Sequence, residues 1–207
     1  MAETSNYIID YDFYKFYSNN NIFLDIFKTR IEYIKNKYSL TMDDNEVIKE
    51  YFVEIFSWSV IPHELLFNIG TFLKENKIQY IIDPSCGNAF HTFLFDTFCN
   101  INTLSCDIQK EEHAWIETIE QDGREFIDEL NKTTYCERAL ILSWIDGEQL
   151  AKELLDKFTG NIIISIGNYV INTDYIDYLQ NHFKLKQHII LNMPWGLTEK
   201  IEIYIKK

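Results

Sequence analysis

The chain has 207 residues, a formal net charge of −13 and 46% hydrophobic residues. That length fits one domain with a small extension, and the apolar fraction is sufficient for a sizeable core. The negative charge opposes a phosphate backbone, so nucleic acid is disfavoured as a partner and a small molecule or a protein is favoured.

Several patterns that would assign a compartment or a metal are missing from the sequence. The N-terminus has no basic region followed by an apolar core, and no apolar run approaches the ~18 residues that span a membrane. The four cysteines have neither C-x-x-C pairs nor metal-type spacing; they are Cys86, Cys99, Cys106 and Cys136. We therefore expect a soluble cytoplasmic protein with reduced cysteines, no membrane partner and no metal site.

The first 56 residues predict helices. Apolar residues recur with the helical period between 22 and 34 and again between 47 and 55, and Thr41 is a candidate N-cap for the second helix. We interpret 1–56 as an N-terminal helical extension and 57–207 as an α/β domain.

Strand and helix patterns alternate after residue 62. The predicted strands are 78–83, 102–107, 115–119, 139–143, 161–166, 186–192 and 200–205, and the predicted helices between them are 90–99, 123–131, 147–158 and 173–183. Such alternation indicates a parallel sheet with helices on both faces. Only Met193 to Glu199 separate the last two strands, which is too short for a crossover helix, so these strands are predicted to form an antiparallel hairpin.

The segment from Ile78 to Ala89 is the most informative part of the sequence. A short apolar run ends in Asp-Pro-Ser-Cys-Gly-Asn-Ala at 83–89, and a helical pattern follows directly. The small residues Ser85, Gly87 and Ala89 would let a ligand approach the backbone at the start of that helix. Asp107 ends the next strand, where an acid can hold two ribose hydroxyls. An ordinary βα turn remains the alternative, but together these features favour a nucleoside-containing cofactor.

Residues 83–90 resemble motif I of class I S-adenosylmethionine (SAM) dependent methyltransferases, especially the form found in amino-group adenine methyltransferases. Over residues 51–207 the chain is also similar to small, largely uncharacterised methyltransferase-like proteins. The features that carry this second resemblance are the segment Phe56–Glu64, the aromatic region around Trp115, the fourth-strand end Ser143-Trp144 and the fifth-strand end Ile166-Gly167.

The resemblance assigns expected roles to individual residues. Asp83, Ser85 and Gly87 would line the methionine end of SAM, and Asp107 would hold its ribose. The other expected cofactor contacts are Ile108 against the adenine, Asp122 at the adenine amine, Trp58, Ser59 and Pro62 in the element before motif I, and Ser143 and Trp144 at the fourth-strand end.

The fourth-strand end departs from the amino-methyltransferase pattern. That family has two prolines before an aromatic residue, whereas this chain reads Ser143-Trp144-Ile145-Asp146. Ser143 occupies the position whose side chain would hold an acceptor amine, and Asp146 is a candidate base or hydrogen-bond partner for it. Asp146 could equally cap the helix that begins at 147 or 148.

Tryptophans provide a further indication of a ligand site. Trp58, Trp144 and Trp195 lie beside predicted strand or helix ends, and Trp115 lies near the weakest strand pattern. Indoles at those positions can stack on a base or on a cation such as a sulfonium. The alternative for each of them is a large core residue.

These observations predict an α/β, Rossmann-like class I methyltransferase sheet of seven strands, with a C-terminal antiparallel hairpin and an N-terminal helical extension. The predicted function is SAM-dependent methyl transfer to a small molecule or protein side chain by direct displacement. Two alternatives stay open: a SAM-binding or regulatory protein without turnover, and a nucleic-acid amino-methyltransferase. A nicotinamide oxidoreductase conflicts with the predicted terminal hairpin.

Overall fold

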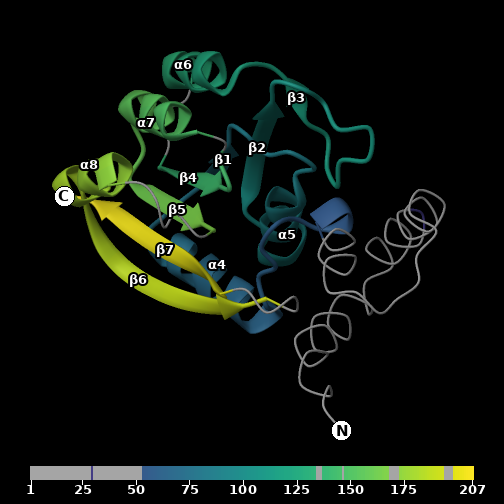
Figure 1. The fold of residues 1–207 in the computed structure, drawn as a ribbon, viewed down its shortest axis with the longest axis horizontal. Coiled ribbons are helices and arrows are strands. Elements are labelled where there is room, and N and C mark those ends of the chain that lie inside the picture. Colours follow the sequence, from purple (N-terminus) through teal and green to yellow (C-terminus); the bar gives the residue numbers. More distant parts are fainter. Residues whose placement is uncertain (1–28, 30–52, 134–136, 146, 168–172, 194–197) are drawn as a thin grey trace, which may run out of the picture.

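The computed structural model describes residue 29 and residues 53–133, 137–145, 147–167, 173–193 and 198–207 (Figure 1). The helices predicted between 22 and 34 and from 41 to 52 lie outside these residues, as do Cys136, Asp146 and Trp195. Residues 53–55 are helical, and the side chains of Ile55 and Phe56 belong to the core of the α/β domain. The packing of that domain therefore includes residues on the N-terminal side of the boundary predicted at 56/57.

A single sheet of seven strands organises the described residues, in the order β3-β2-β1-β4-β5-β7-β6. The first five strands pair in parallel, and β7 pairs antiparallel with both β5 and β6. The strands are β1 Tyr80–Asp83, β2 Asn102–Asp107, β3 Ile119–Glu120, β4 Arg138–Ser143, β5 Ile162–Ile166, β6 Phe183–Asn192 and β7 Thr198–Lys206. The predicted terminal hairpin is confirmed.

Helices cover both faces of this sheet (Figure 1). They are α4 His63–Glu75, α5 Phe90–Cys99, α6 Gly123–Thr133, α7 Glu148–Lys157 and α8 Thr173–His182. Helices α4 and α5 pack in one hydrophobic cluster, and α6, α7 and α8 pack in a second. No described helix has the length and apolar character needed to cross a bilayer.

The two clusters follow from the two-residue period of the strands. Ile81 and Ile141 face the α4–α5 layer, whereas Ile82, Leu140 and Leu142 face the α6–α8 layer. Because both faces are covered, β1 and β4 contain the apolar runs Ile81–Ile82 and Ala139–Leu142, and β1, β2 and β4 each end at a polar residue. Those ends, at Asp83 in β1, Asp107 in β2 and Ser143 in β4, lie on one edge of the sheet.

Strand β3 is the largest departure from the predicted elements. It has two residues, Ile119 and Glu120, both exposed, and pairs only with the end of β2. The rest of the predicted strand 115–119 is irregular. The Trp115 side chain packs on α5, and the Trp115 backbone N–H donates to Asn88 O instead of to a neighbouring strand. At the other edge β6 begins three residues before its predicted start and contains an irregularity between Leu185 and Gln187.

Candidate functional site

A cavity of about 380 Å³ lies at the ends of β1, β2 and β4. Its wall includes part of the β1–α5 turn, the first residues of α5, the end of β2, the end of β4 and the segment before α4. The lining residues are Val53, Glu54, Ser57, Trp58, Ser85, Cys86, Gly87, Asn88, Phe90, His91, Asp107, Glu111, Ser143 and Trp144. Six of the residues predicted from the sequence thus meet at one cavity: Trp58, Ser85, Gly87, Asp107, Ser143 and Trp144.

Asp107 is bonded directly to the small-residue turn. The Gly87 N–H donates to Asp107 Oδ2 over 2.8 Å, and the Gln109 N–H donates to Oδ1 over 3.3 Å. Gly87 has φ +52°, a left-handed conformation that glycine adopts without steric cost. Ala89 adopts a similar φ of 58° immediately before α5. The turn and the acid that the sequence paired by spacing are therefore one hydrogen-bonded unit.

Asp83 lies beneath this unit and outside the cavity lining. Its carboxyl is 1% exposed, and Thr92 Oγ1 donates to Oδ2 over 2.9 Å. Burial raises the pKa of Asp83 to about 7, against the opposing effect of the Thr92 hydrogen bond. Oδ1 is buried without a hydrogen-bond partner among the described residues. A buried carboxylate oxygen in that state would be stabilised by a donor from water or from a ligand.

Asn88 and Trp115 attach the turn to the segment before α4. The Asn88 side-chain amide donates to Phe56 O over 2.7 Å, and the Trp115 indole N–H donates to Ile55 O over 2.6 Å. Trp115 is 4% exposed and its ring lies 5.1 Å from the ring of Phe90. It is therefore a core residue, the alternative stated above for each tryptophan, and it does not line this cavity.

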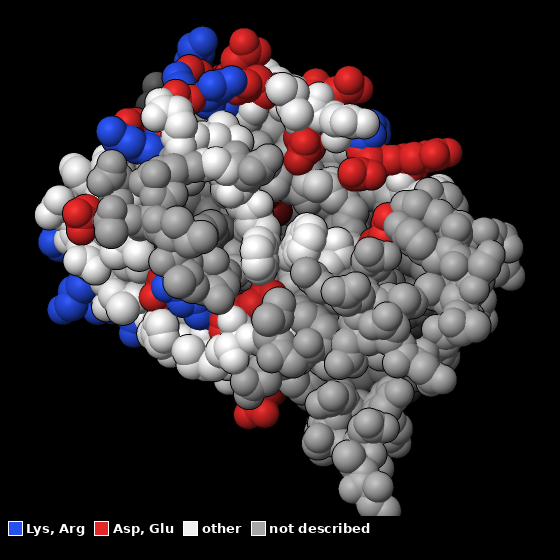
Figure 2. All heavy atoms as spheres, viewed as in Figure 1, with Lys and Arg blue, Asp and Glu red and all other residues white. Residues whose placement is uncertain are grey.

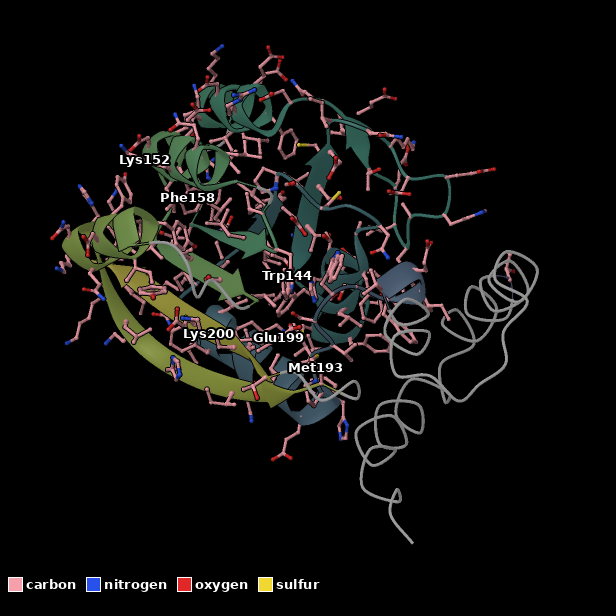
Figure 3. All side chains as sticks on the ribbon, viewed as in Figure 1. Trp144, Lys152, Phe158, Met193, Glu199 and Lys200 are labelled. Atoms are coloured by element: carbon pink, nitrogen blue, oxygen red, sulfur yellow. The ribbon has the colours of Figure 1, made fainter. Side chains whose placement is uncertain are left out.

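Trp144 lines the opposite wall of the cavity in a left-handed backbone conformation, and Figure 3 shows it on the same side of the molecule as Glu199. It has φ +48°, and its backbone N–H continues the sheet by donating to Ile166 O over 3.1 Å. The indole N–H donates to Ser59 Oγ over 2.7 Å and lies 3.3 Å from Glu199 Oε2. Ser59 Oγ in turn donates to Glu199 Oε2, which is on β7 and 3% exposed. Trp58 packs against Trp144 with ring centroids 5.4 Å apart.

His91, in the first turn of α5, lines the cavity and contacts the segment before α4. Its Nε2 lies 2.7 Å from Ser59 O, so this N–H donates to the carbonyl, and 3.2 Å from the Ser57 hydroxyl. Burial lowers the pKa of His91 to about 4, which leaves the imidazole neutral at physiological pH.

Besides Asp83, four predicted cofactor contacts are not part of the cavity wall. Ser59 is fully buried behind Trp144, and Pro62 is the N-cap of α4. Ile108 is 72% exposed beyond the end of β2. Asp122 pairs with Arg124, whose hydrogen bond to it lowers the pKa of Asp122 to about 2. The predicted catalytic residue Asp146 lies outside the described residues, and Gly147 is the N-cap of α7.

Spacing in the sequence did not reveal the remaining wall residues. Asn88, His91 and Ser57 line the cavity and connect the turn and α5 to the segment before α4. Glu199, from the far end of the chain, lies outside the lining and accepts from Ser59, the partner of Trp144. Asn88 follows Gly87 in the motif, which is the one local signal that could have identified it. The others depend on tertiary packing.

The cavity is acidic. Its lining contains Glu54, Asp107 and Glu111 and, within the described residues, no lysine or arginine. On the face shown in Figure 2, acidic side chains gather toward β3 and the segment after β2, and basic ones lie mainly toward α6, α7 and α8. No group of three or more His, Cys, Asp or Glu side chains among the described residues could hold a metal ion.

Comparisons with solved structures identify the fold, and a family profile of a different kind matches the N-terminal part of the chain. A family profile described as a PRANC domain matches residues 2–83, which end with β1, and no curated protein matches the chain. A candidate caffeoyl-CoA O-methyltransferase of Staphylococcus aureus superposes with TM-score 0.51 at 14% identity, covering 85% of this chain and 98% of that one. The fold is therefore that of the Rossmann-like methyltransferases.

Two further solved structures have the same TM-score. A candidate O-methyltransferase of Klebsiella pneumoniae is 8% identical and covers 85% of this chain and 96% of its own. An uncharacterised protein of Listeria monocytogenes serotype 4b is 9% identical and covers 72% of this chain and 69% of its own. At such identities the likeness concerns the path of the backbone.

Proposed function

We propose that the chain binds SAM in this cavity and transfers its methyl group to a small molecule or a protein side chain. The observation that carries the proposal is the bonded unit of Gly87 and Asp107, which faces the same cavity as Ser143 and Trp144. In open α/β sheets, ligands bind in the crevice beyond the carboxyl ends of the strands. The fold shared with O-methyltransferases supports the same reading.

The residues present fit the cofactor. Ser85 and Gly87 leave room for backbone contact, and the Asp107 carboxylate has acceptor capacity for ribose hydroxyls beyond its two backbone bonds. Asp83 lies outside the lining and would support the turn from beneath, where its carboxyl accepts from Thr92 of α5. Ser85, Gly87 and Asp107, supported by Asp83, would therefore hold SAM.

Bound SAM would supply an electrophilic methyl group, with its sulfonium sulfur as the leaving group. Little covalent chemistry is then required of the protein, and positioning the two reactants can supply most of the rate. Ser143 offers a hydroxyl at the end of β4, and Trp144 offers a rigid surface beside it. In this proposal both residues orient the acceptor.

A SAM-binding protein without turnover is the second candidate. The neutral His91, with its pKa lowered to about 4, is a poor base for removing a proton from an acceptor. Ser85 and Ala89 also replace two glycines of the resembled motif, and Ile145 replaces a proline. The third alternative, a nucleic-acid amino-methyltransferase, is opposed by the acidic lining.

Calorimetry with SAM and with its demethylated product S-adenosylhomocysteine tests the proposal. We expect both to bind, and we expect Asp107→Ala to weaken binding by about 1–3 kcal/mol because hydroxyl donors would lose their acceptor. Glu117→Ala is the matched control, since it removes one exposed acidic side chain outside the cavity.

The outcomes separate the candidates. Absence of binding to the wild-type protein would overturn the proposal, and equal affinity of the Asp107→Ala variant would assign the ribose to other residues. Binding of SAM without release of the demethylated product, across pools of small molecules and proteins, would favour the second candidate over the first.

A further inference from the structure

We propose that Trp58 and Trp144 form a cation-binding wall, and that the methyl acceptor is a small organic molecule whose ammonium group rests on it. This inference rests on the proposed function, which it deepens by naming the chemical class of the acceptor. It is carried by the arrangement of the two indoles, by the way Trp144 is fixed, and by the charge of the cavity.

The two indoles form a continuous aromatic surface within the cavity. Their ring centroids are 5.4 Å apart with an interplanar angle of 35°, and both residues line the cavity. Trp58 remains 44% exposed, so part of its indole surface is open beside Trp144. Tryptophan is the strongest cation–π partner among the side chains, so a pair of them favours an ammonium group over a neutral one.

Trp144 is held in place before any ligand arrives. Its indole N–H is bonded to Ser59 Oγ, and the buried Glu199 carboxylate accepts from that hydroxyl and lies 3.3 Å from the indole nitrogen. The backbone of Gly167 passes so close that a Cβ there would lie 3.1 Å from the same nitrogen. A rigid, oriented ring costs little conformational entropy on binding, which is the property of a built recognition surface.

The charges around the wall select for a cation. Glu54 and Glu111 line the cavity together with the two tryptophans, and the hydroxyls of Ser57 and Ser143 can accept hydrogen bonds from an ammonium group. An anionic acceptor would be repelled by these carboxylates, and a neutral planar one would gain stacking only. The whole chain, at −13, also attracts cations over longer distances.

Choline and 3,3-dimethyl-1-butanol are suitable probes because they have nearly the same shape and differ in charge. Binding of each to the full chain is measured by tryptophan fluorescence and calorimetry. We expect choline to bind roughly 5- to 30-fold more tightly than the neutral isostere, the range that one cation–π contact supports. Equal affinities for the two probes, or no choline binding, would contradict the proposal that Trp58 and Trp144 bind a cation.

Variants locate the binding site on the chain. Trp58→Leu and Trp144→Phe should each weaken choline binding several-fold, whereas Phe67→Leu, which replaces an exposed aromatic residue of α4 outside the cavity, should not. Glu111→Gln should weaken binding more than Glu112→Gln, its exposed neighbour outside the lining. Because Trp58 is half exposed, its variant remains informative even if Trp144→Phe fails to fold. An unchanged choline affinity in Trp58→Leu would overturn the assignment.

Saturation with S-adenosylhomocysteine separates this inference from the proposed function. If choline still binds, the wall serves the acceptor, as proposed; competition between the two would assign the wall to the cofactor and overturn the acceptor role. If S-adenosylhomocysteine itself does not bind, the proposed function and the acceptor role both fail, while the choline comparison still decides whether the cation-binding wall exists.

Discussion

The two sides of the cavity are constructed differently. The turn side, residues 83–89 with Asp107, is closed by a hydrogen bond between residues 20 positions apart. The tryptophan side, Ser59 with Trp144 and Glu199, is closed by bonds between residues 85 and 140 positions apart. A local unit and an assembled unit therefore face each other across one ligand space. This difference implies that the turn side can be tested by local substitutions, whereas damage to the tryptophan side should spread to several elements.

Asp83 gives the largest expected effect on the turn side. Its pKa is raised from 3.8 to about 7 by burial, so the folded protein keeps a proton that the unfolded chain has released. Stability contributed by this group is present below pH 4 and is lost as the pH rises through about 7. At 1.36 kcal/mol per pKa unit, the loss approaches about 4 kcal/mol as an upper limit.

Asp83→Asn should remove that dependence. The variant should match the wild type near pH 4 and exceed its stability at pH 8, because an amide has no proton to lose and its oxygen can still accept from Thr92. Urea unfolding followed by circular dichroism across this pH range measures the difference. If the difference in unfolding free energy between wild type and variant does not change with pH, the Asp83 carboxyl is better solvated than its burial implies.

Gly123, the first residue of α6, should give the next largest effect. A Cβ at this position would lie 2.2 Å from Pro84 O, a backbone atom within the turn. Gly123→Ala should therefore shift the turn and cost about 3 kcal/mol, at the upper end of overpacking effects. It should also weaken SAM binding although residue 123 is outside the cavity lining.

Gly87→Ala is the matched control for that substitution. A Cβ at Gly87 meets no atom within 4 Å, and only its φ of +52° opposes alanine, so the expected cost is about 1 kcal/mol. Denaturation midpoints of the two variants check the order. A Gly87→Ala variant less stable than Gly123→Ala would mean that backbone conformation, and not contact with α6, limits the turn.

The sequence allowed prediction of what depends on local patterns. The β1–α5 turn, helix α5 and the terminal hairpin follow from apolar periodicity and connection length, and the structure confirms each of them. Strand β3 could not be bounded because its two exposed residues pair only with the end of β2 and carry no periodic signal. Ser59 was predicted to contact the cofactor. Its bond to Glu199 depends on how β7 packs beside β5, which no local pattern encodes.

On the tryptophan side, Glu199→Ala gives a smaller expected effect. It would leave the Ser59 hydroxyl without its acceptor and remove the second acceptor near the indole nitrogen of Trp144. We expect a loss of about 2 kcal/mol, typical of a buried donor left unsatisfied. Because the same contacts orient the indole, the near-ultraviolet circular dichroism of Trp144 should change as well, and choline binding should weaken in parallel.

Glu199→Gln tests whether the charge or the acceptor matters. Glutamine keeps one carbonyl oxygen that can accept from Ser59, so stability and the tryptophan signal should stay close to those of the wild type. The choline affinity should lie between those of the wild type and the alanine variant, because the negative charge near Trp144 is gone. Ser59→Ala should resemble the glutamine variant in stability, since Trp144 keeps Glu199 as its partner. If Glu199→Ala leaves both stability and the near-ultraviolet signal unchanged, the Trp144 backbone, Gly167 and the Ser59 hydroxyl orient the indole without Glu199, and the contact with β7 is not needed on the tryptophan side.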